Sequence, residues 1–408
     1  MAMKLKPLFA IAIPVFVIGI SSCEKLMPSA PETDQVMDAP LSGLTPAQNK
    51  LFLEGAEEFD EIYTSETGLG PIFVTTSCSG CHAGDNKGHP FTILTRFGQD
   101  DTTGNHFLTM GAPQIQNRAL SGHTGESIPA GATSSKFIAP IAAGVGFLEL
   151  VSDQDLLAMS DPADANGDGI SGVPNWNTIP SWVVPFQNAV TQNGKYICRF
   201  GRKASTYNLH QQTAGAFNND MGITSTFLPV NPTNYLDGLQ PVTVADPEVS
   251  DNSINATVFY LQVLQTPFQR NTSDPQVQQG EMVFKQIGCE DCHRQTLKTG
   301  YSPVAPQLSY QEFHPYTDLL LHDMGAELDD HYTEGTALTS EWRTTPLWGV
   351  GLSTSSQGGE MYLLHDGRAH SFNEAIQFHG GEGSNSRTKF NQLNDADKQA
   401  LIRFLESL

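Results

Sequence analysis

The stretch Cys289-Glu290-Asp291-Cys292-His293 has the spacing Cys-x-x-Cys-His, and Cys78-Ser79-Gly80-Cys81-His82 repeats it upstream. This spacing is the attachment signature of c-type haem, because two thiols three positions apart can each bond to a vinyl group of one porphyrin. The imidazole beside the second thiol can then reach the iron as its proximal ligand. The sequence therefore predicts two covalently bound haem c groups, with His82 and His293 as their iron ligands.

Two other interpretations of Cys-x-x-Cys fit less well. A zinc site needs a second ligand pair nearby, which neither copy has, and a thioredoxin-like site needs a cytosolic βαβ context. The chain has six Cys, of which four lie in the motifs and one at Cys23, so only Cys198 is left (6 − 1 − 4 = 1). We therefore expect no intramolecular disulfide and a buried Cys198 that packs as a small hydrophobic residue.

The N-terminus predicts export. Lys4 and Lys6 precede an apolar segment, residues 7–20, that is too short to span a membrane. Ile20-Ser21-Ser22-Cys23 looks like a bacterial lipobox. We expect residues 1–22 to be a lipoprotein signal peptide, Cys23 to carry lipid, and residues 23–44 to form a flexible tether. A cleaved peptide without lipid is the alternative. The predicted location is the bacterial cell envelope, periplasmic or associated with the outer membrane through the lipid anchor alone.

Charge and length limit the choice of partners and of architecture. The 408 residues include 22 Lys and Arg against 44 Asp and Glu, a net charge of −22. Such a surface repels nucleic acid and anionic lipid, so we expect neither as a partner. A redox partner that docks through charge would present a basic face. The length is typical of two domains.

Helix signals place these domains at residues 45–268 and 269–408. Caps and apolar periodicity predict helices that start after Thr45 and after Asp274, helices over 153–159 and 253–264, and a last helix capped by Asn394. Residues 180–247 are rich in polar residues, Gly and Pro, and predict loops with short helices. The expected fold is mainly α, with two cytochrome c-like haem domains, extensive loops and few short strands. The N-terminal domain would carry long insertions.

The loop Asp164-Ala165-Asn166-Gly167-Asp168-Gly169 matches the first half of an EF-hand-type calcium loop. Asp164, Asn166 and Asp168 would supply oxygen ligands. The closing Glu is absent, since Asn175 stands at the twelfth position, so a metal-free turn remains the alternative.

Longer stretches resemble the di-haem oxidoreductases of the peroxidase type, which are relatives of bacterial di-haem cytochrome c peroxidases. The similarity covers about residues 45–408. The stretches that carry it are residues 114–119, 220–225, 316–325, 342–349, 365–368 and 374–382.

The resemblance implies a distal ligand for the second haem. The position that holds a ligating Met in the peroxidases is occupied here by His379, so the resemblance implies that His293 and His379 ligate one iron. Met324 is the alternative ligand. It also implies that His322 and Arg343 hold haem propionates.

For the first haem, the peroxidases place an acid–base Glu near an open iron. Phe147-Leu148-Glu149-Leu150 resembles that element, which makes Glu149 the candidate, with Arg118 and Gln114 as further pocket residues. One group must accept a proton from peroxide and return it to the leaving oxygen. His89, His106 and His123 are alternatives for a distal ligand.

The resemblance thus predicts an exported di-haem enzyme that reduces hydrogen peroxide, or a similar small oxidant, at the N-terminal haem. Electrons would come through the C-terminal haem from an external donor, a small cytochrome or copper protein. The alternatives are a non-catalytic periplasmic electron-transfer cytochrome and an envelope accessory or redox-sensing binding protein.

Overall fold

The computed structural model describes residues 36–82, 88–238 and 247–408 of the chain. Helices account for 34% of the structure and strands for 12%, so the fold is mixed, with more helix than strand, and the mainly α expectation is confirmed only in part. The signal peptide and Cys23 lie outside the described residues. Among the described residues, no helix is both long enough and apolar enough to cross a membrane.

The helices are α1 (Pro46–Asp60), α3 (Val145–Glu149), α4 (Asp153–Met159), α5 (Leu209–Met221), α6 (Asp251–Val263), α7 (Pro275–Gln286), α8 (Ser353–Ser356), α9 (Phe372–Gln377), α10 (Ser384–Gln392) and α11 (Asp395–Ser407). The strands are β1 (Ile72–Phe73), β2 (Leu94–Gly98), β3 (Arg118–Ala119), β4 (Thr133–Phe137), β5 (Asn175–Asn177), β6 (Thr191–Gln192), β7 (Lys195–Cys198), β8 (Leu297–Lys298), β9 (Glu312–Phe313), β10 (Leu321–Asp323) and β11 (Glu341–Arg343). They form small antiparallel sheets, ordered β1-β3, β2-β4, β5-β7-β6, β8-β9 and β10-β11.

Local capping chemistry sets the predicted helix starts. The Thr45 hydroxyl accepts a hydrogen bond from the Gln48 amide, and the Gln48 side chain accepts one from the Thr45 amide, which completes a capping box on α1. Asp274 caps α7, and Asn394 caps α11 by accepting from the Asp397 amide. These predictions are confirmed. The long helix α5 was not expected within 180–247, because its sequence is polar and its burial depends on distant residues.

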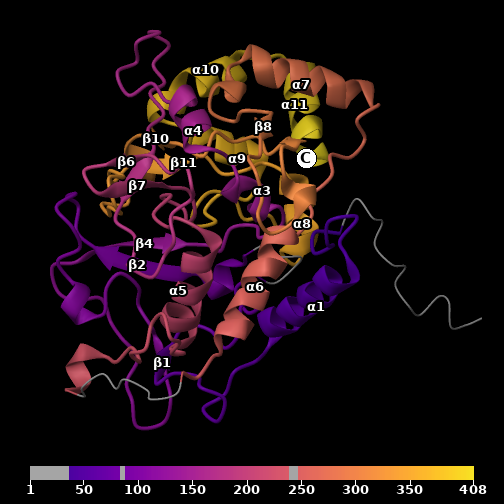
Figure 1. The fold of residues 1–408 in the computed structure, drawn as a ribbon. Coiled ribbons are helices and arrows are strands. Elements are labelled where there is room, and N and C mark those ends of the chain that lie inside the picture. Colours follow the sequence, from indigo (N-terminus) through magenta and orange to yellow (C-terminus); the bar gives the residue numbers. More distant parts are fainter. Residues whose placement is uncertain (1–35, 83–87, 239–246) are drawn as a thin grey trace, which may run out of the picture. The chain divides into compact units, whose positions relative to one another are not determined.

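Each Cys-x-x-Cys-His motif lies next to a pair of packed helices. Helix α1 lies beside α6, and α7 lies beside α11 near the C-terminus (Figure 1). Each pair crosses at a glycine, Gly55 in α1 and Gly280 in α7. A Cβ atom at Gly55 would stand 2.1 Å from the carbonyl oxygen of Ala256, and one at Gly280 would stand 2.0 Å from that of Ala400. The crossings therefore require backbone-to-backbone contact.

The hydrophobic core is not divided at the predicted domain boundary. One cluster consists only of residues after 268 and lies around α7 and α11. A larger cluster joins α1, α5 and α6 to residues of the C-terminal half, for example where Phe313 packs between Phe147 and Trp348. Part of the predicted tether is packed as well: Leu41 packs against this cluster and its amide donates to the Val263 carbonyl, while Met37 is buried in a small separate cluster with Ala143 and Leu352.

The Gly280 crossing gives a stability prediction. Gly280→Ala should lower the free energy of unfolding by about 1–3 kcal/mol, because the added methyl group overpacks the α7–α11 contact. Gly215→Ala is the matched control, since a Cβ in the middle of α5 would meet its nearest neighbour at an ordinary 3.7 Å. That variant should be neutral or stabilising. Equal denaturation curves for the two variants would contradict this account of the crossing.

Candidate haem sites

The second Cys-x-x-Cys-His motif follows directly from the end of α7. Gly288 has a φ of +87°, which turns the chain into a 3-10 helix over Cys289–Asp291. The His293 amide donates to the Cys289 carbonyl, and the imidazole Nδ1 donates to the Tyr316 carbonyl at 3.0 Å. Burial lowers the pKa of His293 to about 4. The imidazole is therefore neutral, and its Nε2 lone pair is free for a metal.

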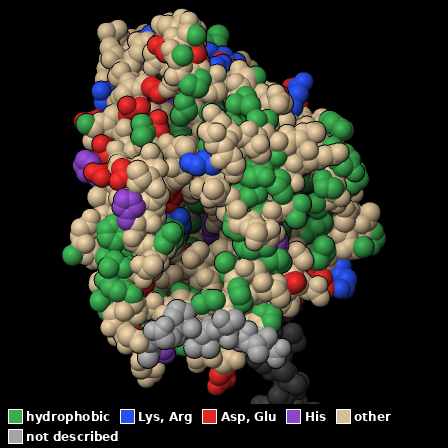
Figure 2. Space-filling model, turned by 60° about the vertical axis from the view of Figure 1, so that its left-hand side comes forward, with side chains coloured by type: hydrophobic (Ala, Val, Ile, Leu, Met, Phe, Trp, Pro, Cys, Tyr) green, Lys and Arg blue, Asp and Glu red, His purple; other side chains and the backbone are tan. Residues whose placement is uncertain are grey.

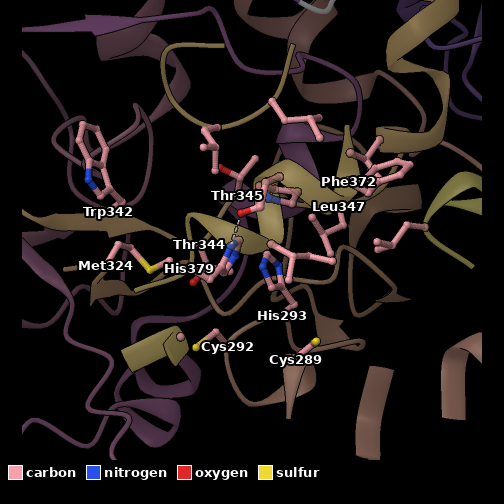
Figure 3. Close-up of a pocket in the computed structure, with 18 of the residues that line it drawn as sticks. Cys289, Cys292, His293, Met324, Trp342, Thr344, Thr345, Leu347, Phe372 and His379 are labelled. Atoms are coloured by element: carbon pink, nitrogen blue, oxygen red, sulfur yellow. Dashed lines mark hydrogen bonds between the residues drawn. The ribbon is translucent and has the colours of Figure 1, made fainter. Parts of the chain in front are cut away.

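His379 meets His293 from the opposite element. It follows α9, and its Nδ1 donates to the Ala375 carbonyl at 2.7 Å, while burial lowers its pKa. The two ring centroids are 6.4 Å apart with planes at 45° (Figure 3). In the same view Met324 lies beyond His379, on the side away from His293. Both imidazoles thus have the same tautomer, and neither Nε2 has a hydrogen-bond partner among the described residues.

The separation of the imidazoles fits one iron between them. A metal–nitrogen bond is about 2 Å long and the centre of an imidazole ring lies about 1 Å further on, so two ligands on opposite sides of a metal have centroids about 6 Å apart. The observed distance matches this requirement. The residues present therefore fit a haem whose iron His293 and His379 would hold between them.

The cavity around this pair fits the rest of a porphyrin. Its walls are mostly apolar, with Leu347, Phe372 and Ile376 among the lining residues, and Cys289 and Cys292 lie together at one side (Figure 3). Burial raises the pKa of Cys289 to about 12, which disfavours the thiolate that a zinc site or disulfide exchange would need. The indole nitrogen of Trp348 lines the same cavity and has no partner within the described structure.

His322 lies at this site but both its nitrogens are engaged. Strand pairing of β10 with β11 brings it beside Cys292, whose sulfur is 3.6 Å from Nδ1. Nδ1 also contacts Glu382 at 2.7 Å, and Nε2 contacts Asp318 at 2.9 Å. Although burial opposes protonation, the two carboxylates raise the pKa of His322 well above its usual range. The charged imidazole joins β10 to the segment after His379, and its predicted contact with a propionate gains no support from this arrangement.

The first motif lies between α1 and the end of α5. The His82 amide donates to the Cys78 carbonyl, and the His82 ring is 5.8 Å from that of Phe59 on α1. Asp220, at the end of α5, is an electrostatic neighbour of both thiols, and burial raises the pKa of its carboxyl to about 6.

Two of the predicted pocket residues lie in this region and the third lies elsewhere. The Gln114 amide donates to the Asp220 carboxylate and to the Asn219 carbonyl, and Arg118 on β3 is an electrostatic neighbour of Cys81. Glu149 is buried at the end of α3. Its carboxylate accepts from the Leu209 amide at 2.7 Å and from Gln262 at 2.8 Å, so both oxygens hold α3 against other helices.

Two of the three histidines considered as distal ligands have local partners. His106 is exposed and contacts Thr103, and His89 accepts from the Phe91 amide.

The acidic loop 161–172 forms a network of backbone turns. Asp164, Asn166 and Asp168 accept hydrogen bonds from the amides of Gly169, Asp168 and Ile170. In the part of the chain that the structure describes, no three His, Cys, Asp or Glu side chains converge as a metal site. The predicted Ca²⁺ therefore remains a prediction from sequence alone.

Sequence reasoning missed two buried charged groups. Glu126 lies on a loop and accepts from the Gln116 amide at 2.9 Å, while its other oxygen has no partner within the described residues. Arg202 lines the cavity beside Arg343. In the sequence, Arg202 could have been noticed because Arg199, Arg202 and Lys203 cluster directly after a short strand. Glu126 could not, because an isolated Glu in a loop has no distinguishing sequence pattern.

Comparison with known proteins decides the family. The sequence model described as "Di-haem oxidoreductase, putative peroxidase" matches residues 134–408, more than half of the chain. The chain belongs to the di-haem oxidoreductase family. The match includes the second Cys-x-x-Cys-His motif and begins after the first, so the assignment of a haem to Cys78, Cys81 and His82 depends on the motif itself.

Other comparisons add little to this di-haem oxidoreductase assignment. No curated protein matches the chain significantly. Among solved structures, hydrazine synthase from Kuenenia stuttgartiensis, pressurised with 20 bar xenon, matches at 14% identity with a TM-score of 0.30. The alignment covers 73% of this chain and 100% of that one. A likeness at this level carries no argument about fold or function.

The His322 cluster gives a pH-dependent prediction. Contacts with His322 and Ser171 outweigh burial and lower the pKa of Glu382 to about 2. A lowered carboxyl pKa stabilises the fold above its unfolded value of about 4.5 and loses that effect as pH falls towards 2. Glu382→Gln should cost about 3–5 kcal/mol at pH 7, since His322 loses a buried counter-charge. The difference from wild type in chemical denaturation should shrink below pH 4.5.

Glu327→Gln is the control for this experiment. Glu327 also forms an ion pair, with Arg387 at 3.2 Å, but its side chain is 61% exposed. The cost should stay below about 1 kcal/mol. A Glu382→Gln penalty that is equally small, or that grows on acidification, would contradict the charged-imidazole arrangement.

Proposed function

We propose that this protein is an exported di-haem c-type oxidoreductase that reduces peroxide, or a similar small oxidant, at the haem of Cys78, Cys81 and His82. The observation that supports separate roles for the two haems is the facing pair His293 and His379. Two imidazoles on one iron leave no open position there, so the second haem can only pass electrons. The substrate must then react at the first haem.

The first site needs an acid–base group, and Glu126 fits better than Glu149. Gln114 and Gln116 both donate to the Asn219 carbonyl, next to Asp220, the electrostatic neighbour of the motif thiols. The Gln116 backbone amide in turn donates to Glu126, so hydrogen bonds link this carboxyl to the Asn219 carbonyl, one residue before Asp220. Glu126 is only 7% exposed, and one of its oxygens has no partner among the described residues, whereas both oxygens of Glu149 accept hydrogen bonds.

Proton transfer at Glu126 suits peroxide chemistry. Burial raises its pKa to about 7, so at neutral pH the carboxyl can both accept and donate a proton. When bound, the haem supplies a redox-active iron at which an O–O bond can be cleaved. The Glu126 carboxylate would take the proton from one peroxide oxygen and deliver it to the other oxygen, which leaves as the O–O bond breaks. Reduction to two waters also takes two electrons from a reduced donor protein and two protons from solvent.

The donor would be a small cytochrome or copper protein with a basic docking face. Acidic side chains gather at the upper left of the face in Figure 2, and the chain carries a net charge of −22. Such a surface attracts a basic partner at low ionic strength. Lipidation at Cys23 would hold the pair in the cell envelope.

The acid–base assignment predicts a difference between two buried carboxyls. With hydrogen peroxide and a reduced small c-type cytochrome as donor, Glu126→Gln should slow turnover by about 10²–10⁴-fold, because the amide cannot accept the proton. Haem content should stay normal. Glu149→Gln should reduce thermal stability instead, with turnover per folded molecule unchanged. Unchanged kinetics for Glu126→Gln with slow turnover for Glu149→Gln would return the role to Glu149.

The ligand assignment predicts a change of spin state. His379→Ala should convert the second haem from low-spin to high-spin, measured by its visible spectrum in the oxidised protein, whereas Met324→Ala should leave it low-spin. A low-spin His379→Ala protein would exclude His379 and favour Met324. If both haems of the wild type are low-spin and peroxide changes neither spectrum, the protein is an electron carrier and the peroxidase proposal fails.

A further inference from the structure

Three buried cations lie within residues 199–203, and two of them have their charge compensated. Arg199 pairs with Asp153 and donates to the carbonyls of Glu149 and Val151. The Lys203 ammonium donates to three carbonyl oxygens at 2.8–3.0 Å and lies 4.0 Å from the centre of the Trp342 ring. These contacts stabilise the buried charges of Arg199 and Lys203. The third cation, Arg202, has no such set of partners.

Arg202 is 8% exposed and has a second arginine as its neighbour. Its Nε donates to the Ile138 carbonyl at 2.9 Å, and one terminal nitrogen has only a 3.4 Å contact with Thr345. Arg343 is 6% exposed, and its Nε donates to the Gly201 carbonyl at 2.9 Å. Its backbone amide also donates to the Arg202 carbonyl. The terminal nitrogens of Arg343 have no protein partner among the described residues.

The nearest carboxylates are already paired with other cations. Asp366 is the acidic neighbour of Arg202, but it binds Arg368 at 2.8 Å. Asp318 is the acidic neighbour of Arg343, but it binds His322 at 2.9 Å. Burial, and for Arg343 also repulsion from Arg202, lowers the pKa values to about 10 and about 9. Both side chains are therefore charged at neutral pH and buried, and neither forms an ion pair with a carboxylate of the described residues.

Two unpaired buried charges would cost several kcal/mol each, so the site calls for anions. Both guanidinium groups line the cavity that also contains Cys289, His293 and His379. A haem held there brings two carboxylates of its own, and a planar guanidinium binds a carboxylate through paired hydrogen bonds. The number and chemistry of the missing anions match the number and chemistry of the haem propionates.

We propose that Arg202 and Arg343 form a clamp for the two propionates of the haem at Cys289–His293 and that their charge raises its reduction potential. This inference rests on the proposed attachment of that haem. Reduction removes one positive charge from the iron site, so nearby cations favour the reduced state. The clamp would thereby offset the low potential that two imidazole ligands impose.

The experiment uses the holoprotein and measures the midpoint potential of the low-spin haem by spectroelectrochemical titration. Arg202→Gln and Arg343→Gln should each lower the ratio of reduced to oxidised haem at a fixed potential about tenfold, which is about 59 mV for one electron. Arg343→Lys keeps the charge and should stay close to the wild type. Arg403→Gln removes a surface arginine that pairs with Asp274 and should leave the potential unchanged.

Intact mass distinguishes a failure of haem attachment from a failure of the arginine clamp. Loss of covalent haem from a Cys289→Ala, Cys292→Ala variant confirms the attachment, and absence of haem there in the wild type overturns both proposals. Haem retained with an unchanged potential in both Gln variants overturns the clamp alone.

A free anion, in place of the propionates, could also neutralise Arg202 and Arg343. This alternative is tested on the unmodified holoprotein, so the result does not depend on the folding of a variant. With propionates in the clamp, inorganic phosphate should not change the potential or the melting temperature in a saturable way. Saturable binding of phosphate that shifts the haem potential would assign the arginines to an external anion and overturn the clamp.

Discussion

The distance between the imidazoles of His293 and His379 is the constraint on which the rest of the C-terminal half depends. Each ring is held by a hydrogen bond from Nδ1 to a backbone carbonyl, so the two Nε2 atoms face one space. Two glycines place the second ring. A Cβ at Gly380 would stand 2.7 Å from the Met324 carbonyl oxygen, and one at Gly381 would stand 2.1 Å from that of Asp323. This close approach brings the loop after α9 onto β10.

Ion pairs also fix the segments that surround the cavity. Glu382, one residue beyond this glycine pair, binds His322 and the Ser171 side chain, and so connects the acidic loop to the ligand segment. Asp318 completes the pairing of His322. Asp318, Glu382 and Asp366 thus pair with His322 or Arg368, while Arg202 and Arg343 have no ion pair with a carboxylate of the described residues. The proposed electron-transfer role would benefit from this arrangement, because fixed charges need not reorganise when the charge on the iron changes.

Features set by neighbouring residues could be predicted from sequence, and features set by distant ones could not. The caps Thr45 and Asn394 bind amides three positions away, so their patterns fix helix starts locally. Both Cys-x-x-Cys-His motifs could likewise be recognised from sequence, because each consists of five consecutive residues. By contrast, α5 is buried through Phe217 and Met221 against residues far along the chain. Glu126 and Arg202 gain their chemistry from burial and from missing partners, which only the tertiary structure reveals.

The pairing of His293 with His379 is tested most directly by electron paramagnetic resonance and near-infrared spectra of the oxidised, unmodified holoprotein. We predict a low-spin haem with the signature of two imidazole ligands, alongside a second haem of different ligation. A near-infrared band characteristic of His–Met ligation at the Cys289–His293 haem, without any bis-imidazole signal, would contradict it.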